Sequence, residues 1–270
     1  MDLIDMNKPL TVEDIQSFEK LGYIVVKNAV SDVLARDLAE FMLDFQIKCN
    51  CTSFETQNDY AEGIVKMVHH PLQWKLRESP IIYLAFSQLL KEHKLWVTLD
   101  RGKIVPPASF DGYLQKGFIH WDINTNILPE TIPLQGLVAL TDTKAGQGGF
   151  QCVPGFHRDF AKWKELQPVN RDPYRPDLTG MNIVEVEMEA GDLVIWNSLL
   201  PHGNSPNLTN VPRIAQFVRL FPCNTMKTHT LQQRLYMWEN KLPYGKSDLL
   251  NFDEPKLSPL GERLLGLRSW

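Results

Sequence analysis

The sequence predicts a mainly β fold with flanking helices. From about residue 96 onward, short runs rich in β-branched and aromatic residues are separated by Gly, Pro, Asn and Asp, which is typical of an all-β sandwich or barrel. No segment of helical length alternates regularly with these runs, which argues against a parallel, doubly wound sheet. Before residue 96, apolar residues recur at helical spacing, so the N-terminal part is expected to be mainly helical.

The helical part, residues 1–95, opens with "TVEDIQSFEKLGYIVV". Thr11 is a suitable N-cap. The apolar positions after it follow a helical period, at Val12, Ile15, Phe18 and Leu21. Gly22 is expected to end this helix, and "YIVV" to form a short strand. A second helix is expected from Ser31, with an apolar face at Leu34, Leu38, Phe41 and Phe45. A third helical stretch is predicted between about residues 74 and 92.

The β part, residues 96–222, includes the runs "LWVTLD", "KGFIHWDIN", "LQGLVALTD", "GGFQCVPG", "NIVEVEME", "DLVIWNS" and "RIAQFVRLF". Residues 158–178 are expected to be an insertion, made of a short helix and a Pro-rich loop. The tail, residues 223–270, is expected to be helical again from about 228 to 239. Because no linker or internal repeat divides the chain, residues 1–270 are predicted to form a single domain.

Composition narrows the class of protein. The chain has 270 residues, a net charge of −4 and no basic block, which argues against a nucleic-acid partner. No apolar run is long enough to span a bilayer, and the acidic N-terminus lacks the features of a signal peptide. A cytoplasmic protein with no membrane partner is therefore expected. The 4 cysteines are scattered and are expected to be reduced thiols. The pattern predicts no particular oligomeric state.

The stretch "GFIHWDINTN", residues 117–126, carries a histidine and an aspartate two positions apart. Positions i and i+2 of a strand share a face, so His120 and Asp122 would point the same way. The opposite face would be apolar and pack against helices, at Ile119, Trp121 and Ile123. The two polar residues are either surface polars on an edge strand or two ligands of one metal ion.

A third ligand is expected from another strand, because a facial set of three requires a second direction. The run "DLVIWNSLLPHGNSPN" supplies His202 just after a strand. Two histidines and one carboxylate leave three positions open on one side of a non-haem Fe(II), the arrangement that oxygen chemistry uses. Arg213 begins the next strand, where a guanidinium can hold a carboxylate through two parallel hydrogen bonds. Alternatively, His202 is a loop histidine hydrogen-bonded to the backbone, and Arg213 is a surface residue in an ion pair.

The order of these features resembles the phytanoyl-CoA dioxygenase (PhyH) family of Fe(II)/2-oxoglutarate-dependent oxygenases, over roughly residues 10–222. "HWDIN" is similar to the family's first metal motif, and "GDLVIWNSLLPHGNSPNLTNVPR" to its distal motif. "ALTDTKAGQGGFQCVPGFH" is similar to the strand-hairpin-strand segment between them. Two positions depart from the family pattern. Phe156 stands where serine is common, and Asn204, followed by Ser205, stands where a serine often helps to bind the co-substrate.

The resemblance implies an enzyme with a double-stranded β-helix core, that is, a cupin-like jelly roll. It implies that the catalytic residues His120, Asp122 and His202 bind Fe(II), and that Arg213 pairs with the far carboxylate of 2-oxoglutarate. O2 would be consumed, with release of succinate and CO2. Halogenating relatives have a small residue in place of Asp122. Hydroxylation, or a desaturation or dealkylation derived from it, is therefore favoured.

Three more residues are candidates within this frame. Gln135 begins the run "QGLVAL" and lies either near the co-substrate or substrate, or in water at a strand end. His157 either faces the pocket and the substrate or has a structural role at the start of a helix. Arg219 shares strand parity with Arg213, so it is expected to face inward near the rim and to meet an acid, water or substrate.

The resemblance also places the loop 50–70 and the insertion 158–178 beside the barrel mouth, where long loops commonly act as lids. Their side chains suit a small polar metabolite better than a long acyl chain. Natural-product or amino-acid tailoring, such as that of mycosporine-like amino acids, is one expectation. Two alternatives are a non-catalytic metal-binding jelly-roll protein and a cupin-type enzyme that needs no 2-oxoglutarate. Arg213 argues against a pure metal clip, which has no use for a dicarboxylate anchor.

Overall fold

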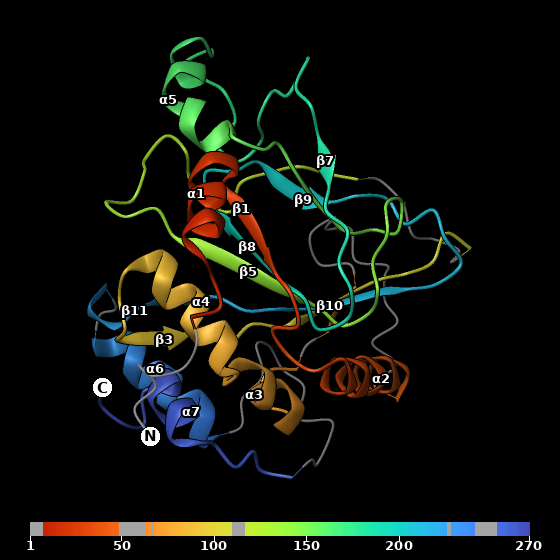
Figure 1. Cartoon of the computed structure of the whole chain (residues 1–270), viewed down its shortest axis with the longest axis vertical. Coiled ribbons are helices and arrows are strands. Elements are labelled where there is room, and N and C mark those ends of the chain that lie inside the picture. The colour runs from red at the N-terminus through yellow and green to blue at the C-terminus, as the bar shows by residue number, and fades with distance from the viewer. Residues whose placement is uncertain (1–7, 49–62, 66, 110–116, 226–227, 241–252) are drawn as a thin grey trace.

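The computed structural model describes residues 8–48, 63–65, 67–109, 117–225, 228–240 and 253–270 (Figure 1). Its helices are α1 (Val12–Leu21), α2 (Asp32–Lys48), α3 (Pro71–Arg77), α4 (Pro80–Leu90), α5 (Phe156–Glu165), α6 (Thr228–Glu239) and α7 (Pro259–Leu265), with a 3-10 turn, η2 (Cys223–Thr225). Its strands are β1 (Tyr23–Val26), β2 (Ile64–Val65), β3 (Leu95–Val97), β4 (Gly102–Val105), β5 (Leu134–Ala139), β6 (Phe150–Cys152), β7 (Val184–Glu185), β8 (Leu193–Asn197), β9 (His202–Asn204), β10 (Arg213–Phe217) and β11 (Leu220–Pro222). Most of the loop expected to be a lid, 50–70, lies outside the described residues.

The N-terminal helices begin where the sequence predicts. The hydroxyl of Thr11 accepts a hydrogen bond from the backbone N–H of Asp14 at 3.1 Å, and the Asp14 carboxylate accepts one from the backbone N–H of Thr11 at 2.9 Å. Gly22 ends α1 with a φ of 82°, a left-handed conformation that favours glycine. The helical stretch predicted at 74–92 is instead two helices, α3 and α4. Pro80 separates them, because a proline forces the residue before it out of the helical conformation and begins a new helix capped by Ser79.

Two antiparallel sheets form the core. The larger has six strands in the order β1-β8-β5-β10-β4-β2, and the smaller has three in the order β7-β6-β9. The rings of Phe150 on β6 and Trp196 on β8 lie 4.7 Å apart, so the two sheets face each other. Figure 1 shows β7 and β9 on one side of the large sheet, with α2, α3 and α4 on the other. The predicted mainly β jelly-roll core with flanking helices is confirmed.

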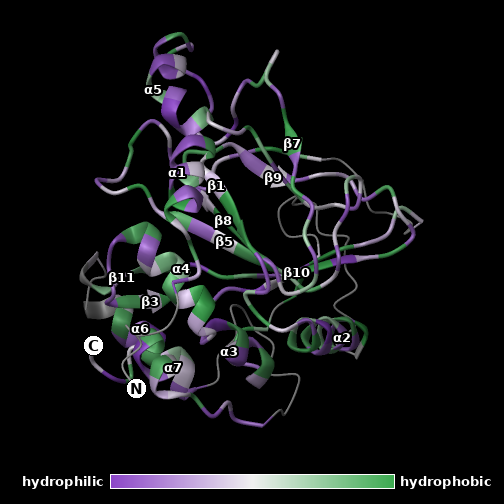
Figure 2. Cartoon of the chain, in the orientation of Figure 1, coloured by the Kyte–Doolittle hydropathy of each residue, from purple (hydrophilic) through white to green (hydrophobic). Residues whose placement is uncertain are grey.

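Apolar clusters lie on both sides of the six-stranded sheet. Strand β10 shows the division: Ile214 belongs to the cluster shared with the helices, whereas Ala215 belongs to the cluster between the two sheets. Side chains alternate along a strand, so Arg213 and Phe217 point to the same side as Ala215, into the jelly roll. Figure 2 shows the apolar stretches on α4 and β8 that supply these clusters.

The run "KGFIHWDIN", residues 116–124, was expected to be a strand, and from residue 117 onward it is less regular than predicted. It meets β9 at one bridge, between His120 and His202, and through a hydrogen bond from the backbone N–H of Phe118 to the carbonyl of Asn204 at 3.2 Å. Beyond His120 the backbone N–H of Trp121 donates to the carbonyl of Tyr174 at 2.9 Å. The insertion thus draws the chain away from β9, which ends the pairing after the bridge.

The C-terminal part contains the predicted helix, α6, and a second one, α7, that was not predicted. Ser258 caps α7, Pro259 occupies its first turn, and Gly266 ends it in the left-handed conformation, so the start and stop signals were present in the sequence. Among the described residues, no helix combines the length and apolar character needed to cross a bilayer.

Candidate active site

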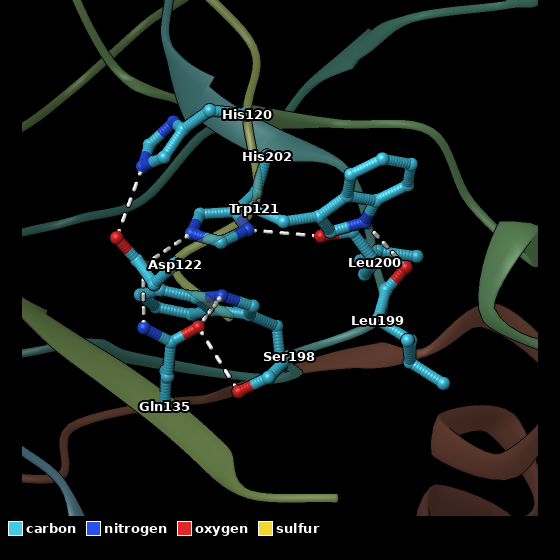
Figure 3. Close-up of polar contacts among 9 residues, drawn as sticks. His120, Trp121, Asp122, Gln135, Ser198, Leu199, Leu200 and His202 are labelled. Carbon is cyan, nitrogen blue, oxygen red and sulfur yellow. Dashed lines mark hydrogen bonds and ion pairs between the residues drawn. The ribbon is translucent and has the colours of Figure 1, made fainter. Parts of the chain in front are cut away.

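Three side chains from two distant parts of the sequence, His120, Asp122 and His202, meet at the start of β9 (Figure 3). Nε2 of His120 lies 3.2 Å from Oδ1 of Asp122, and Nε2 of His202 lies 3.1 Å from Oδ2 of the same carboxylate. One ligand atom from each residue falls within 4.8 Å of the others. The backbones of His120 and His202 exchange two hydrogen bonds, of 2.9 and 3.1 Å, which place the two imidazoles side by side.

The orientation of His202 leaves one ring nitrogen directed at the other two residues. Its Nδ1 lies 2.9 Å from the carbonyl oxygen of Leu200, which accepts a hydrogen bond from the Nδ1–H group. Nε2, which faces Asp122, is then the ring nitrogen that could offer its lone pair to a metal in place of its hydrogen bond to Asp122. Trp121, the residue between the other two candidate ligands, donates its indole N–H to the adjacent carbonyl of Leu199 at 2.9 Å. One short segment, 199–202, thus orients both sides of the site.

Asp122 is held as a carboxylate. Burial alone would raise its pKa, but hydrogen bonds from His120 and His202, together with their charges, outweigh this effect and hold the pKa of Asp122 well below its usual range. Its side chain keeps 47% of its surface exposed, toward the cavity described below. An ionised, accessible carboxylate beside two imidazole nitrogens is a donor set that suits a ferrous ion and leaves coordination positions open.

Gln135 fixes the position of this carboxylate. Its Nε2 donates to Oδ2 of Asp122 at 2.6 Å, while its Oε1 accepts from Nε1 of Trp196 at 3.0 Å and from the hydroxyl of Ser198 at 3.2 Å (Figure 3). The two donors on Oε1 settle which way the amide faces. From the sequence, Gln135 was expected either near the co-substrate or substrate or in water at a strand end; it lines the cavity. The structure directs its amide to Asp122, so the residue acts on a candidate ligand and orients it.

An aromatic cage packs behind the ligand-bearing segment. The Trp121 side chain is 1% exposed. It contacts three rings from the α5 region, with centroids 5.4 to 5.8 Å from its own, namely Phe156, Phe160 and Trp163. The guanidinium of Arg171 lies 5.3 Å from the Trp163 ring and donates to the hydroxyl and carbonyl of Thr125 at 2.8 and 3.1 Å. The insertion 158–178 therefore supports the site from behind, and none of its residues is among the described ones that line the cavity.

A cavity of about 400 Å³ opens in front of the three residues. Among the described residues, its charged lining outside the triad consists of Asp100, Arg101, Lys103 and Arg219. Its aromatic lining includes Phe118, Phe150, Trp196 and Phe217. A larger hollow, of about 1270 Å³, lies among α4, α7 and their neighbours and contains none of the triad. The smaller cavity is the one with convergent polar groups, which is the usual mark of an active site.

Arg213 is fully buried at the start of β10 and points into the jelly roll. Its Nη1 donates to Oδ1 of Asn204 at 3.5 Å. Asn204 lies on β9 two residues after His202, so the two side chains share a face, and Asn204 lines the cavity. Ser205, the other candidate at this turn, is 2% exposed and is not part of the lining. The structure thus places Asn204 in the cavity of the triad and Arg213 in contact with Asn204.

His157 lies away from the cavity, and Lys103, which was not predicted, lines it. His157 does not line this cavity; its ring Nε2 lies 3.1 Å from the carbonyl oxygen of Glu19 and joins α5 to α1, the structural alternative. Lys103 was missed, although it lines the cavity, is only 5% exposed and pairs across the sheet with Ala215. Lys103 precedes Ile104, which faces the helices, so the alternation of side chains along a strand would have placed Lys103 on the inner face. No strand was predicted at these residues, so this signal was not used.

The comparisons with known proteins agree with this geometry. A family model described as phytanoyl-CoA dioxygenase (PhyH) matches residues 18–215. The chain belongs to this family. A phytanoyl-CoA dioxygenase-type protein of Dictyostelium discoideum is 25% identical over 305 residues, which cover 93% of this chain and 85% of that protein. The ectoine dioxygenase of Bordetella parapertussis is 24% identical over 235 residues, covering 77% of this chain and 74% of the relative.

Among solved structures, EctD from S. alaskensis with 2-oxoglutarate and 5-hydroxyectoine matches with a TM-score of 0.59 at 17% identity, covering 81% of this chain and 78% of that one. The likeness confirms the jelly-roll fold. Membership of the family confirms the predicted class of enzyme: the chain is a 2-oxoglutarate-dependent non-haem iron dioxygenase.

We expect Gln135→Ala to weaken metal binding about 10- to 100-fold, because Asp122 loses the donor that fixes its orientation. Titration of the full chain with Mn(II), followed by electron paramagnetic resonance of the free ion, measures this affinity. Gln232→Ala, at an exposed position of α6, is the matched control and should bind like the parent. Equal affinities for the parent and Gln135→Ala would contradict the positioning role.

Arg171→Ala should lower the free energy of unfolding by about 1–2 kcal/mol, since the hydrogen bonds to Thr125 and the cation–π contact with Trp163 are lost. Metal affinity should fall as well, because the cage holds Trp121 between two candidate ligands. Chemical denaturation and the same Mn(II) titration measure the two effects. Arg175→Ala is the control, since Arg175 is exposed and its pair with Asp172 is 4.0 Å long. A loss of stability with unchanged metal affinity would restrict the cage to a role in folding.

Proposed function

We propose that this chain oxidises a C–H bond of a small metabolite, using Fe(II) held by His120, Asp122 and His202. The observation that supports the proposal most is the convergence of these three side chains at a cavity lined by Asn204, with the buried Arg213 in contact with Asn204. When bound, iron(II) would supply the activation of O2 that accompanies decarboxylation of 2-oxoglutarate to succinate and CO2. Everything else in the reaction is binding and orientation by the protein.

The role proposed for Arg213 is to bind the far carboxylate of 2-oxoglutarate. A guanidinium matches a carboxylate through two parallel hydrogen bonds, and in a buried site this pairing gains strength. Asn204 lies between Arg213 and His202, so it is proposed as a second polar contact for the co-substrate. Lys103, buried on the same inner face, adds a further positive charge to this wall. Two positive charges and one amide favour the binding of a dianion such as 2-oxoglutarate.

The volume and lining of the cavity limit the size and the chemical character of the substrate. About 400 Å³ lies at the small end of the range for small-molecule sites, which favours a compact metabolite over a long acyl chain. Phe118, Phe150 and Phe217 exclude water from the reacting atoms. Asp122 occupies the third ligand position, which supports hydroxylation or a product derived from it. Natural-product or amino-acid tailoring, as for mycosporine-like amino acids, remains a prediction within this class.

The proposal is tested with four variants of the full chain. His120→Ala, Asp122→Ala and His202→Ala should each bind iron much more weakly and lose all formation of succinate from 2-oxoglutarate. Arg213→Gln should still bind iron, but its KM for 2-oxoglutarate should rise at least about tenfold, the loss expected for one charged hydrogen-bonded contact. Succinate release in the presence of Fe(II) and O2 measures both effects.

Arg158→Gln, at an exposed position of α5, is the matched control for Arg213→Gln and should leave the KM unchanged. If all four variants released succinate like the parent, the assignment of the site would be wrong. Iron binding without any succinate from a broad metabolite panel would favour the metal-binding alternative. Oxidation that survives Arg213→Gln without added 2-oxoglutarate would favour a cupin-type enzyme independent of that co-substrate.

A further inference from the structure

A second arginine lies on the inner face of the same strand line as Arg213. Arg213, Ala215 and Phe217 point into the jelly roll, and Arg219 has the same parity two residues beyond β10. The backbone N–H of Val218 donates to the carbonyl of Gly136 at 3.0 Å, which continues the pairing of Phe217 with Leu137. This continuation places Arg219 opposite Gln135, and the Arg219 side chain lines the cavity.

The two arginines approach the triad from opposite sides. Arg213 contacts Asn204, which follows His202 on β9. Arg219 instead lies opposite Gln135, whose amide donates to Asp122 at 2.6 Å. The two arginines are six positions apart along extended chain, so their Cα atoms are roughly 20 Å apart. One guanidinium is therefore at the proposed co-substrate side of the site, and the other is near its opposite end.

The Arg219 backbone is fixed, whereas its charged group is available. Its backbone N–H donates to the hydroxyl of Thr98 at 3.1 Å, and its carbonyl accepts from the backbone N–H of Thr98 at 2.8 Å. Among the residues that the structure describes, its guanidinium has no hydrogen bond or ion pair. The nearby carboxylate of Asp100 accepts a hydrogen bond from the Thr98 hydroxyl. An arginine held in this way can meet a ligand without first breaking another contact.

The charge of the surrounding wall favours an anion. Apart from the triad, the charged lining that the structure describes comprises three cationic side chains and one carboxylate, at Arg101, Lys103, Arg219 and Asp100. Beside the Arg219–Gln135 pair, the next two inward residues along the strands, Leu137 and Phe217, are apolar and also line the cavity. A ligand that fits both features has a charged group at one end and an apolar body that reaches the triad.

We propose that the substrate is a small carboxylic acid in its ionised form. Arg219 would bind the carboxylate group of this substrate, and the apolar part of the substrate would point toward the three candidate metal ligands. This inference rests on the function proposed above and narrows the substrate class. Amino acids and other organic acids with an apolar segment belong to it. The guanidinium would donate two parallel hydrogen bonds to the carboxylate, which fixes one end of the substrate and limits the carbons that can reach the centre.

The test uses Mn(II) in place of iron, so that no turnover occurs, and saturating 2-oxoglutarate to fill the co-substrate site. The probes are three matched pairs: butanoate and butanamide, hexanoate and hexanamide, phenylacetate and phenylacetamide. Bound Mn(II) accelerates the proton relaxation of a probe held near it, with a steep dependence on distance. In the parent chain, at least one carboxylate should show this effect at concentrations where its amide does not.

Arg219→Gln should weaken the apparent affinity for that carboxylate about tenfold, the factor for one charged hydrogen-bonded contact. Arg219→Lys should retain part of it, because the charge stays and the bidentate geometry is lost. Arg268→Gln is the control, because Arg268 is 55% exposed and pairs with Glu262 in the C-terminal segment. Thermal unfolding of each variant confirms that it is folded.

Mn(II) and 2-oxoglutarate must bind to Arg219→Gln as they do to the parent. If the parent itself failed to bind both, the proposed function would fall and not merely this inference. If both bound, yet no carboxylate were preferred to its amide, the inference would be overturned while the proposed function stood. Parental affinity of Arg219→Gln for the preferred carboxylate would overturn the inference in the same way.

Discussion

The site depends on the two backbone hydrogen bonds that join His120 to His202. They bring together residues from two distant parts of the chain and fix the spacing of both imidazoles. Asp122, two residues after His120, then reaches both rings without further adjustment. The surrounding contacts refine this arrangement: the Leu200 carbonyl orients one imidazole, and the Gln135 amide orients the carboxylate. A single bridge is sufficient because it lies at the ligands themselves.

The two faces of the six-stranded sheet have different roles: one packs against the helices, and the other carries residues near the site. On its helix side, residues such as Ile214 belong to the larger apolar cluster, and Gln216 bonds to Gln73 of α3 at 2.8 Å. On its inner side, the same strand carries the buried Arg213, which contacts Asn204 of the cavity lining. The alternation of a strand therefore lets adjacent residues serve different purposes. The cost of burying Arg213 and Lys103 inside a jelly roll is offset only when the charges meet partners, which is why a dianionic co-substrate suits this wall. The same reasoning underlies our proposal of an anionic substrate.

Much of the fold and of the candidate site could be predicted from the sequence, because the deciding signals are local. Thr11 and Gly22 mark the ends of a helix, and the histidine-aspartate spacing together with His202 marks the candidate ligands. What depends on long-range partners could not be predicted. The amide of Gln135 is directed by Trp196 and Ser198, and His157 contacts the carbonyl of Glu19 in α1. The insertion was expected at the mouth, yet its rings pack behind Trp121. Lys103 was missed because the short strand β4 was not predicted.

X-ray absorption spectroscopy of the full chain, loaded anaerobically with Fe(II), tests most directly whether two histidines and a carboxylate hold the iron. We expect coordination by nitrogen and oxygen only, with multiple scattering from two imidazoles. In His202→Ala carrying residual iron, the contribution should fall to one imidazole. A spectrum with sulfur ligands, or one whose imidazole scattering is the same in the parent and in His202→Ala, would contradict this assignment of the ligands.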